Sequence, residues 1–301
     1  MSNDRDITVK MQAKRHVTAS RTAIKSPLAT LIQMALAEDI GSGDVTTKAI
    51  VDPKLQARAI IESQSPLVLC GMDVARKVAH TVDARLTWKA FKKDGDFCEA
   101  EEPLAELSGN ASSLLVAERT MLNFLQHLSG IATQTHKYAD AIKHTKAKVT
   151  DTRKTIPGYR ELAKAAVLAG GGVNHRMGLY DRYLVKNNHI DMAESVPDAL
   201  ESIRMHGKPG IMLEVECRDF DELEEAIEFG AKMVLLDNFP IDDVRKAIRL
   251  VAGRVLVEVS GGITLDNIVS YAESGPNFIA VGALTHSAPA VPIHMLIEPI
   301  S

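Results

Sequence analysis

The second half of the chain alternates short apolar segments with helical patterns. The apolar segments are almost free of polar residues, which is typical of strands in a parallel sheet covered on both faces. Strands are predicted at residues 149–152, 183–188, 210–217, 232–238, 254–261 and 277–284. Helices are predicted between them at residues 161–169, 194–206, 219–229, 241–252 and 264–274. The late strand–helix units repeat at roughly 21–24 residues, so the pattern predicts an α/β fold with a partial or complete β/α barrel of about six or seven strands.

The first half of the chain has shorter and more mixed patterns. Residues 1–25 show no periodicity and are predicted to be a flexible extension. Ser26 and Pro27 are then suited to the N-cap and the first turn of a helix. Residues 55–108 contain strand-like segments, turns and one helical segment at 72–82, which predicts a separate unit of mixed strands and helices.

Residues 111–145 carry a long helical pattern of leucines, with an expected interruption near Gly130. On the opposite face Arg119, Asn123 and Gln126 recur at helical spacing. A solvated polar face is the ordinary explanation of such a row, so the pattern alone gives Arg119 no function.

Each predicted strand of the second half ends in polar residues or glycine. These residues are Thr152, Arg153, Lys186, Glu214, Glu216, Asp237, Asn238, Glu258, Ser260 and Gly282. In β/α barrels the active site is built from the C-terminal ends of the strands and the loops that follow them. We therefore expect the site at this rim. Because residues two apart share a face of a strand, the pattern does not decide between Glu214 and Glu216, or between Glu258 and Ser260.

The charge of the chain is uneven. The whole chain carries a formal net charge of −4, with 46% hydrophobic and 25% charged residues, as is usual for a globular protein. Residues 151–189 hold seven lysines and arginines against three acids, a local balance of +4. A basic pocket in an acidic protein indicates a small anionic substrate and no nucleic-acid partner.

Five cationic or imidazole side chains are expected to converge over the barrel mouth. They are Arg153, Lys154, His175, Arg176 and Lys186. An arginine guanidinium binds a carboxylate through two parallel hydrogen bonds, and lysine binds phosphate as a point charge. Several cations at one mouth therefore suit a ligand with both carboxylates and phosphates, although each of them alone is more often a solvated surface residue.

Glu216 and Asp237 are expected among these cations at neighbouring strand ends. Two carboxylates there can hold Mg²⁺ together with substrate oxygens, or they can bind ribose hydroxyls. A third explanation is that they only balance the cations.

A phosphate site is predicted at the late strands. Ser260, Gly261 and Gly262 precede Thr264, where a helix is expected to start. Glycines leave backbone N–H groups accessible, and a helix N-terminus favours an anion. Residues 282–283 (Gly282 and Ala283) on the next strand would complete this cradle.

The remaining composition bears on compartment and membrane. No apolar run approaches the ~20 residues that cross a bilayer, and the N-terminal residues lack a secretory signal, so we expect no membrane partner. Cys70, Cys98 and Cys217 lack C-x-x-C spacing and predict neither a disulfide framework nor a zinc site. This cysteine use is typical of a reducing compartment, and we expect a cytoplasmic protein.

Several long motifs occur in one order along the chain. They are EDIGSGDVTT (38–47), ERTMLNFLQHLSGIAT (118–133), DTRKTIPGYR (151–160), GGVNHRMGLYD (171–181), KNNHI (186–190), LLDN (235–238) and EVSGGI (258–263). In these motifs the chain, from about Leu28 to its end, resembles the quinolinate phosphoribosyltransferases, also called carboxylating nicotinate-nucleotide pyrophosphorylases. The resemblance implies a Mg²⁺-dependent reaction of quinolinate with phosphoribosyl pyrophosphate. The implied products are nicotinate mononucleotide, pyrophosphate and CO₂, formed in de novo NAD biosynthesis.

The resemblance also implies the architecture. An N-terminal α/β sandwich domain is expected at residues 26–130, rejoined by residues 286–301, and an open β/α barrel at residues 131–285. A homodimer is implied, in which Arg119 reaches into the pocket of the partner subunit.

Residue roles follow from the same resemblance. The implied substrate-binding residues are Arg119, Thr152, Arg153, Lys154, His175, Arg176, Lys186, Glu216, Asp237, Ser260, Gly261, Gly262, Gly282 and Ala283. The implied catalytic residues are Lys154, Lys186, Glu216 and Asp237, and the last two are also the implied Mg²⁺ ligands. The arginines and His175 are the implied clamp for the quinolinate carboxylates, and the serine, the glycines and Ala283 bind the 5′-phosphate.

Other functions fit parts of the pattern. A β/α-barrel lyase or aldolase would use Lys186 to form a Schiff base with a carbonyl substrate. A related phosphoribosyltransferase-like protein would keep the cradle but take another acceptor. A non-catalytic phosphometabolite-binding protein would be expected to have lost charged residues at the mouth, and here they are present.

Overall fold

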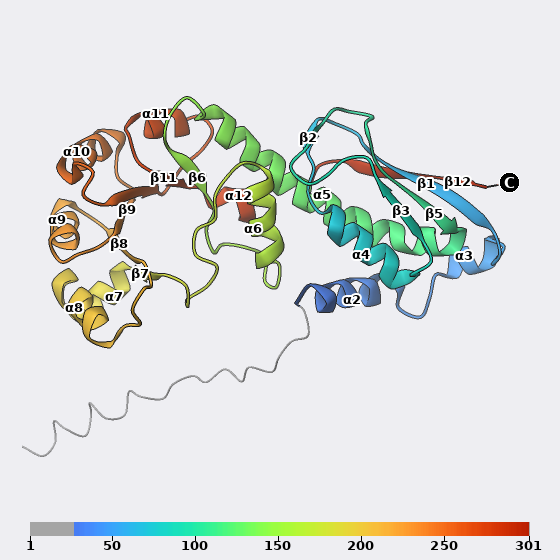
Figure 1. Cartoon of the computed structure of the whole chain (residues 1–301), viewed down its shortest axis with the longest axis horizontal. Coiled ribbons are helices and arrows are strands. Elements are labelled where there is room, and N and C mark those ends of the chain that lie inside the picture. Colours follow the sequence, from blue (N-terminus) through green and yellow to red (C-terminus); the bar gives the residue numbers. More distant parts are fainter. Residues whose placement is uncertain (1–26, 301) are drawn as a thin grey trace, which may run out of the picture.

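Two sheets connected by one long helix organise the chain (Figure 1). The structure is a computed structural model that describes residues 27–300, so the predicted extension 1–25 and the predicted N-cap Ser26 lie outside the described residues. Within the described part, no helix is both long enough and apolar enough to cross a membrane.

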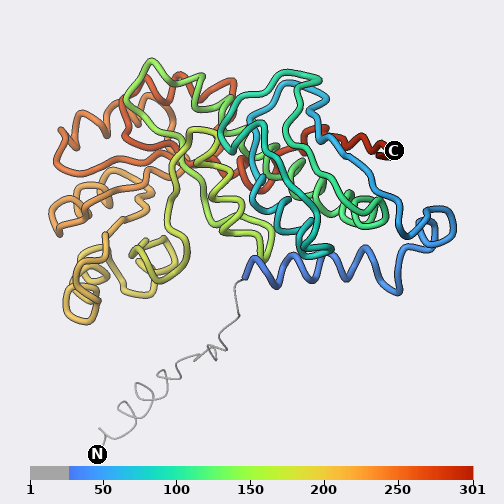
Figure 2. Tube along the Cα trace, turned by 45° about the vertical axis from the view of Figure 1, so that its right-hand side comes forward, coloured from blue at the N-terminus to red at the C-terminus, as the bar shows by residue number. Residues whose placement is uncertain are grey.

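The first sheet has four antiparallel strands in the order β12–β1–β5–β3. They are β1 (Gln56–Ser63), β3 (Thr87–Ala90), β5 (Pro103–Asn110) and β12 (Ile293–Pro299). Burial alternates along β1, where Ala57, Ala59 and Ile61 are buried, because successive side chains point to opposite faces. The last strand pairs with β1, so the end of the chain returns to the N-terminal unit (Figure 2).

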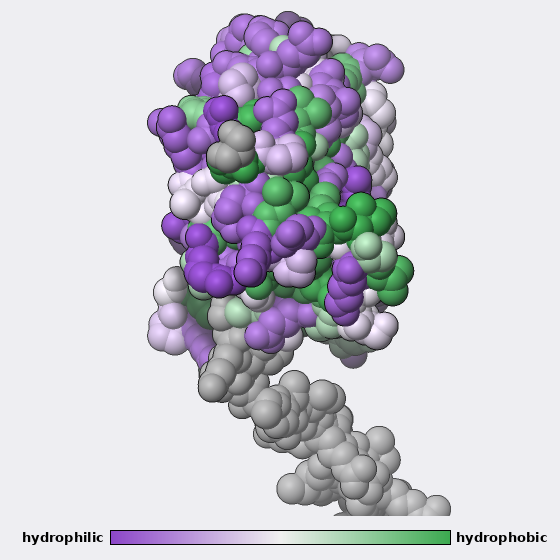
Figure 3. Space-filling view, turned by 90° about the vertical axis from the view of Figure 1, so that its right-hand side faces the viewer, coloured by the Kyte–Doolittle hydropathy of each residue, from purple (hydrophilic) through white to green (hydrophobic). Residues whose placement is uncertain are grey.

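Short elements complete this unit. They are α2 (Pro27–Ile40), α3 (Val45–Ile50), α4 (Met72–Val82), β2 (Leu67–Val68) and β4 (Phe97–Cys98). Helix α3 begins after Asp44 because this carboxylate accepts hydrogen bonds from the backbone N–H groups of Thr46 and Thr47. Figure 3 looks onto this end of the molecule, where hydrophilic side chains surround smaller hydrophobic patches. Val45 and Ile50 of α3 and Leu296 of β12 are exposed in this unit.

The long helix α5 (Ala111–Ala141) runs from the first sheet to the second (Figure 1). The predicted interruption near Gly130 is wrong, because the helix continues through this residue. A Cβ atom at Gly130 would lie 2.2 Å from the carbonyl oxygen of Pro289. The glycine therefore allows the segment that leads into β12 to pack closely against the helix, and it does not end the helix. Gln126 Nε2 also donates to the Ile293 carbonyl oxygen at 2.7 Å.

The second sheet has six parallel strands in the order β6–β11–β10–β9–β8–β7. They are β6 (Lys148–Thr150), β7 (Tyr183–Val185), β8 (Leu213–Cys217), β9 (Met233–Asp237), β10 (Leu256–Ser260) and β11 (Phe278–Ala280). All six predicted strands are present. Because β6 and β7 occupy opposite edges, the barrel is open, and the predicted α/β fold with a sandwich and an open barrel is confirmed.

Helices follow the strands of this sheet. They are α6 (Arg160–Ala169), α7 (Asn187–Ala193), α8 (Val196–His206), α9 (Phe220–Glu228), α10 (Ile241–Val251), α11 (Ile268–Glu273) and α12 (Ala283–His286). The strand predicted at 183–188 ends at Val185, because the backbone N–H of Lys186 donates to His189 Nδ1 at 2.9 Å and the chain turns into α7. Likewise, the segment predicted as a strand through residue 284 leaves the sheet after Ala280 and forms α12.

Candidate active site

A cavity of about 750 Å³ opens at the C-terminal ends of the parallel strands. Its lining includes every predicted site residue except Arg119. These are Thr152, Arg153, Lys154, His175, Arg176, Lys186, Glu216, Asp237, Ser260, Gly261, Gly262, Gly282 and Ala283. The parallel sheet brings them together because all its strands end at one rim.

Arg119 lies elsewhere. Its side chain projects from α5, is 58% exposed and lies 3.7 Å from the carboxylate of Glu118. The cavity of the same subunit does not include it.

The cations predicted at the mouth do line the cavity, but they are only part of the seven lysines and arginines of residues 151–189. Four of them line the cavity: Arg153, Lys154, Arg176 and Lys186. The other three, Arg160, Lys164 and Arg182, bind carbonyl oxygens or carboxylates behind the lining. The local net charge includes all seven side chains, but it does not show which of them face the cavity. That depends on the fold.

Arg160 connects the two loops that carry the cavity cations. Its guanidinium donates to Thr155 Oγ1 at 2.7 Å, to the Arg153 carbonyl oxygen at 2.8 Å and to the Met177 carbonyl oxygen at 2.9 Å. The adjacent Tyr159 stacks on Phe124 of α5, with ring centroids 5.9 Å apart. The first loop is thus fixed both to the second loop and to the long helix.

Lys164 and Asp151 form a buried ion pair below the cavity. Lys164 Nζ also donates to the His175 carbonyl oxygen at 2.9 Å, and the His175 backbone N–H donates to Asp151 Oδ1 at 2.9 Å. Burial raises the pKa of Asp151, although Lys164 opposes this shift. The pair holds the main chain of His175 from both sides.

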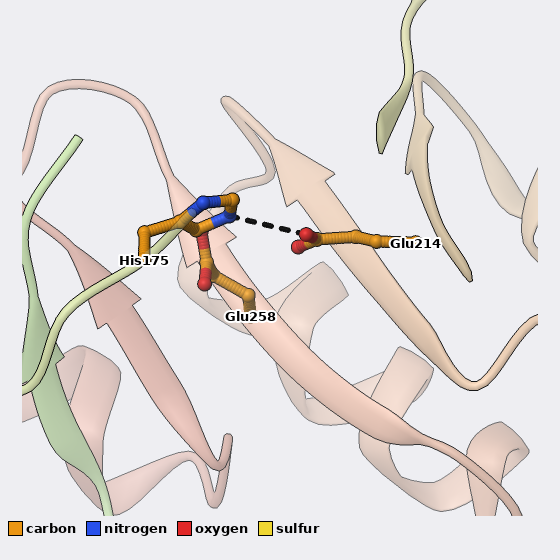
Figure 4. Close-up of side chains that lie close together, drawn as sticks. All are labelled: His175, Glu214 and Glu258. Atoms are coloured by element: carbon orange, nitrogen blue, oxygen red, sulfur yellow. Dashed lines mark ion pairs between the residues drawn. The ribbon is translucent and has the colours of Figure 1, made fainter. Parts of the chain in front are cut away.

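The Nε2 atom of the His175 ring faces two buried glutamates, Glu214 and Glu258 (Figure 4). The backbone N–H of Arg176 donates to His175 Nδ1 at 2.7 Å, so the ring proton is on Nε2 and points to Glu214 Oε2 at 3.1 Å. Arg182 Nη1 donates to the same Glu214 oxygen at 3.1 Å. Glu258 Oε1 lies 3.6 Å from His175 Nε2, beyond a hydrogen bond.

These three side chains have the residue types of a cation site, but their contacts do not suit one. A metal would need the nitrogen of His175 that donates to Glu214, and Arg182 already supplies the positive charge at Glu214. Burial opposes ionisation of Glu214, but the hydrogen bond from His175 and the charge of Arg182 outweigh it and lower its pKa. Burial and the nearby Glu214 charge raise the pKa of Glu258 well above its ordinary value.

The glycine cradle lies after β10. Gly261 has φ +100°, and a Cβ atom there would lie 2.1 Å from Asn238 Oδ1. The expected helix start at Thr264 was wrong, because Asn267 binds Thr264 N–H (2.8 Å) and the Gly262 carbonyl (2.9 Å) in a turn, and α11 follows at Ile268. The cradle is therefore formed by loop backbone and not by a helix end.

Comparison with known proteins decides the family. The family model described as quinolinate phosphoribosyl transferase, N-terminal domain, matches residues 44–129, and the model of its C-terminal domain matches residues 131–296. The chain belongs to the quinolinate phosphoribosyltransferase family.

Individual relatives agree with this assignment. The chain is 39% identical to the probable nicotinate-nucleotide pyrophosphorylase [carboxylating] of Bacillus subtilis, over 89% of this chain and 92% of that protein. It is 42% identical to the carboxylating enzyme of the same name from Mycobacterium leprae, over 85% of this chain and 92% of that protein. The solved nicotinate-nucleotide pyrophosphorylase of Francisella tularensis superposes with a TM-score of 0.87 at 39% identity, over 90% of this chain and 96% of that chain.

Within this quinolinate phosphoribosyltransferase fold, the acidic residues at neighbouring strand ends fit a hard cation. Glu216 and Asp237 both line the cavity, and each provides carboxylate oxygens. Lys186 Nζ donates to Glu216 Oε2 at 2.8 Å, and Asn238 Nδ2 donates to Asp237 Oδ2 at 2.9 Å. Two carboxylates on an open cavity suit Mg²⁺ that is bound partly by substrate oxygens.

The sequence interpretation of this phosphoribosyltransferase missed His286. It lines the cavity from α12, and a Cβ atom at Gly282 would lie 3.1 Å from its Nε2. His286 follows Gly282 by four residues, so in a helix the two residues lie on the same face. This spacing could have indicated His286, but the segment was predicted as a strand. The pattern also left Glu258 and Ser260 as alternatives, whereas both line the cavity.

Proposed function

We propose that this chain transfers the phosphoribosyl group of phosphoribosyl pyrophosphate to quinolinate with loss of CO₂. The products are nicotinate mononucleotide and pyrophosphate, in NAD biosynthesis. One observation carries the proposal. A single cavity combines a cationic wall of Arg153 and Arg176 with the glycine cradle at Gly261 and Gly262. An aromatic dicarboxylate and a sugar phosphate each need one of these two surfaces.

The carboxylates of quinolinate are assigned to Arg153, His175 and Arg176. Burial lowers the pKa of Arg176, yet a guanidinium stays charged at neutral pH. Two planar guanidinium groups suit two adjacent carboxylates on a flat ring, because each can form paired hydrogen bonds. Thr152, whose side-chain oxygen accepts from the backbone N–H of Lys154 at 3.0 Å, shapes the start of this wall.

The donor is assigned to the opposite side. Lys154 and Lys186 neutralise charge on the phosphates as pyrophosphate leaves, and Ser260 with the cradle glycines and residues 282–283 (Gly282 and Ala283) holds the 5′-phosphate. Glu216 and Asp237 would hold Mg²⁺, which supplies charge neutralisation of the leaving pyrophosphate. The same carboxylates stabilise the positive charge that develops at the anomeric carbon.

The active unit is proposed to be a homodimer. The support is the position of Arg119, which is exposed on α5 outside the cavity of its own subunit although it lies within the residues that match the family's N-terminal domain model. A partner subunit placed against this cavity would supply the missing guanidinium.

A cytoplasmic location is part of the same proposal. Its support is that Cys70, Cys98 and Cys217 are free and buried, as suits a reducing compartment.

The Schiff-base alternative is disfavoured by one contact. Lys186 Nζ donates to Glu216 Oε2 at 2.8 Å, and an ammonium group held by a carboxylate is not a nucleophile. Borohydride trapping of a carbonyl substrate on Lys186 would support the lyase, and we expect none.

Product formation tests the proposal directly. Purified protein is incubated with phosphoribosyl pyrophosphate, Mg²⁺ and either quinolinate or nicotinate, and pyrophosphate, CO₂ and mononucleotide are measured. We expect turnover with quinolinate and little with nicotinate. Absence of turnover with quinolinate from folded dimeric protein would contradict the proposal.

Substrate binding tests the assignment of the clamp. Arg153→Ala is expected to abolish quinolinate binding and to leave binding of phosphoribosyl pyrophosphate largely intact, as measured by calorimetry. Equal loss of both ligands would contradict the separate surfaces assigned above.

A further inference from the structure

Glu258 is a cavity residue to which the proposed roles give no task. It lies on β10, is 1% exposed and still contributes to the cavity lining. Its Oε1 atom finds no hydrogen-bond partner among the described residues. The carboxyl group therefore lies at the floor of the cavity, close to the ring of His175 and to Glu214 (Figure 4).

The charges around Glu258 favour its neutral form. Glu214 is balanced by Arg182, whose Nη1 lies 3.1 Å away, and His175 donates its Nε2 proton to the same oxygen. An ionised Glu258 would add a second buried negative charge with no cation of its own. Such a charge is expensive to bury, so the group keeps its proton. The raised pKa of Glu258 has this same cause.

The other cavity side chains that could donate a proton either bind a carboxylate already or lie on the phosphate side of the cavity. The Nε2 proton of His175 is held by Glu214, and Lys186 is held by Glu216. Lys154 and His286 both lie against Gly282, on the side assigned to phosphate. Glu258 is beside His175, on the side assigned to the carboxylates of the acceptor.

We propose that Glu258 is the acid that protonates the pyridine ring after CO₂ has left. This inference rests on the proposed function and adds a residue to its last step. In that step the bond between ring carbon C2 and its carboxylate breaks, and the electron pair stays on C2. The Glu258 O–H bond then breaks, its proton forms the new C2–H bond, and the carboxylate recovers a proton from water at the cavity mouth.

The location suits this chemistry in two ways. While quinolinate binds, a neutral Glu258 adds no repulsion toward the two carboxylates of the ligand. After CO₂ leaves, the carbanion next to the positively charged ring nitrogen needs a proton donor that is shielded from bulk water. A positioned general acid contributes roughly 10²–10⁴-fold to such a step.

The test separates the two chemical events in the variant Glu258→Gln. Glutamine keeps the size and the neutral charge of the protonated acid but cannot transfer a proton. Rapid-quench measurements follow pyrophosphate and CO₂ separately, with phosphoribosyl pyrophosphate, Mg²⁺ and quinolinate. Until the carbanion is protonated it can recombine with the CO₂ still held in the cavity, so loss of the acid slows the net release of CO₂. We expect pyrophosphate to form at the wild-type rate in the first turnover, about 10²-fold slower CO₂ release, and accumulation of phosphoribosylated quinolinate. The acid-retaining variant Glu258→Asp should recover part of the CO₂ rate.

Two kinetic outcomes would overturn the inference. Unchanged CO₂ release in Glu258→Gln would show that another group supplies the proton. Equal slowing of pyrophosphate and CO₂ would show a structural role. Wild-type protein in the same assay reports on the proposed function itself, so failure of wild type with quinolinate is distinct from failure of the variant effect alone.

The proton on Glu258 can also be observed without any substrate. The infrared spectrum of the wild-type protein at neutral pH should contain a carboxylic-acid C=O band that is lost in Glu258→Gln. A wild-type spectrum whose acid band is unaffected by the substitution would overturn the inference whichever acceptor the enzyme uses.

Discussion

Arg160 fixes the position of Arg153, since its Nη2 donates to the Arg153 carbonyl oxygen at 2.8 Å. The same guanidinium binds Thr155 and Met177, so one side chain joins the loop after β6 to the loop before β7. The three hydrogen bonds start from three different nitrogens of the planar guanidinium, an arrangement that the single nitrogen of a lysine does not reproduce. Arg160 therefore positions cavity residues without lining the cavity itself.

Arg160→Lys should weaken catalysis without removing the charge. A lysine can replace at most part of the three hydrogen bonds, and a small displacement of the clamp lowers the rate of a reaction that depends on orientation. We expect kcat/KM for quinolinate to fall by about 10²-fold, with KM raised. Arg245→Lys, an exposed change on α10, is the matched control and should leave kinetics unchanged. Equal kinetics for the two variants would rule out the role given to Arg160.

Lys164→Met should cause a large loss of stability. The substitution leaves the Asp151 carboxylate buried and without its cation, which typically costs about 3–5 kcal/mol. Urea unfolding measures the free energy of unfolding, and Lys143→Met provides the control. Lys143 is 72% exposed and pairs with Asp140, so its loss should change stability by less than about 1 kcal/mol. A similar decrease in the free energy of unfolding for both variants would show that the buried ion pair stabilises the protein no more than an exposed one.

Strand ends were predictable from the sequence because apolar runs and the residues that follow them are local features. Thr152, Glu216, Asp237 and Ser260 were placed at the cavity on that basis. Whether a cation faces the ligand is not local. Lys164 lies on α6 and points down to Asp151, and no pattern of spacing distinguishes it from a surface lysine.

Glycines were harder to interpret for the same reason. Gly130 was taken as a helix interruption, but its role depends on Pro289, which is far away in the sequence. Gly261 was recognised as a cradle residue, yet the space it leaves is filled by Asn238 from the neighbouring strand end. Packing partners of this kind are known only when the fold is known.

Glu258→Gln should change how stability depends on pH. Burial raises the pKa of Glu258 in the folded state, so between the ordinary carboxyl pKa and this raised pKa the folded protein binds more protons than the unfolded chain. The contribution of Glu258 is thus fully present below the unfolded pKa and is lost as pH rises. This loss has a slope of up to about 1.4 kcal/mol per pH unit. The variant lacks this loss, so the free energy of unfolding of Glu258→Gln minus that of the wild type should increase with pH.

Urea unfolding of both proteins across mildly acidic to neutral pH measures this difference. Shifted groups that do not interact with Glu258, such as Asp83, are common to both proteins and cancel. Glu201→Gln, an exposed change on α8, should show no such trend. A difference between wild type and Glu258→Gln that stays constant with pH would mean that Glu258 is ionised in the folded protein throughout.

Arg119→Ala and Lys186→Ala should each be inactive alone and regain activity when mixed. Lys186 lines the cavity of its own subunit, whereas Arg119 lies outside it and is proposed to act in the partner subunit. In a mixed dimer, one of the two pockets then contains both wild-type residues, and the other contains neither. Random exchange gives at most about one quarter of wild-type activity, because half of the dimers are mixed and each has one intact pocket. Activity is measured after subunit exchange, and differently tagged subunits verify that mixed dimers form. If mixed dimers are present and no activity returns, Arg119 acts in the pocket of its own subunit, as Lys186 does, and the shared site is excluded.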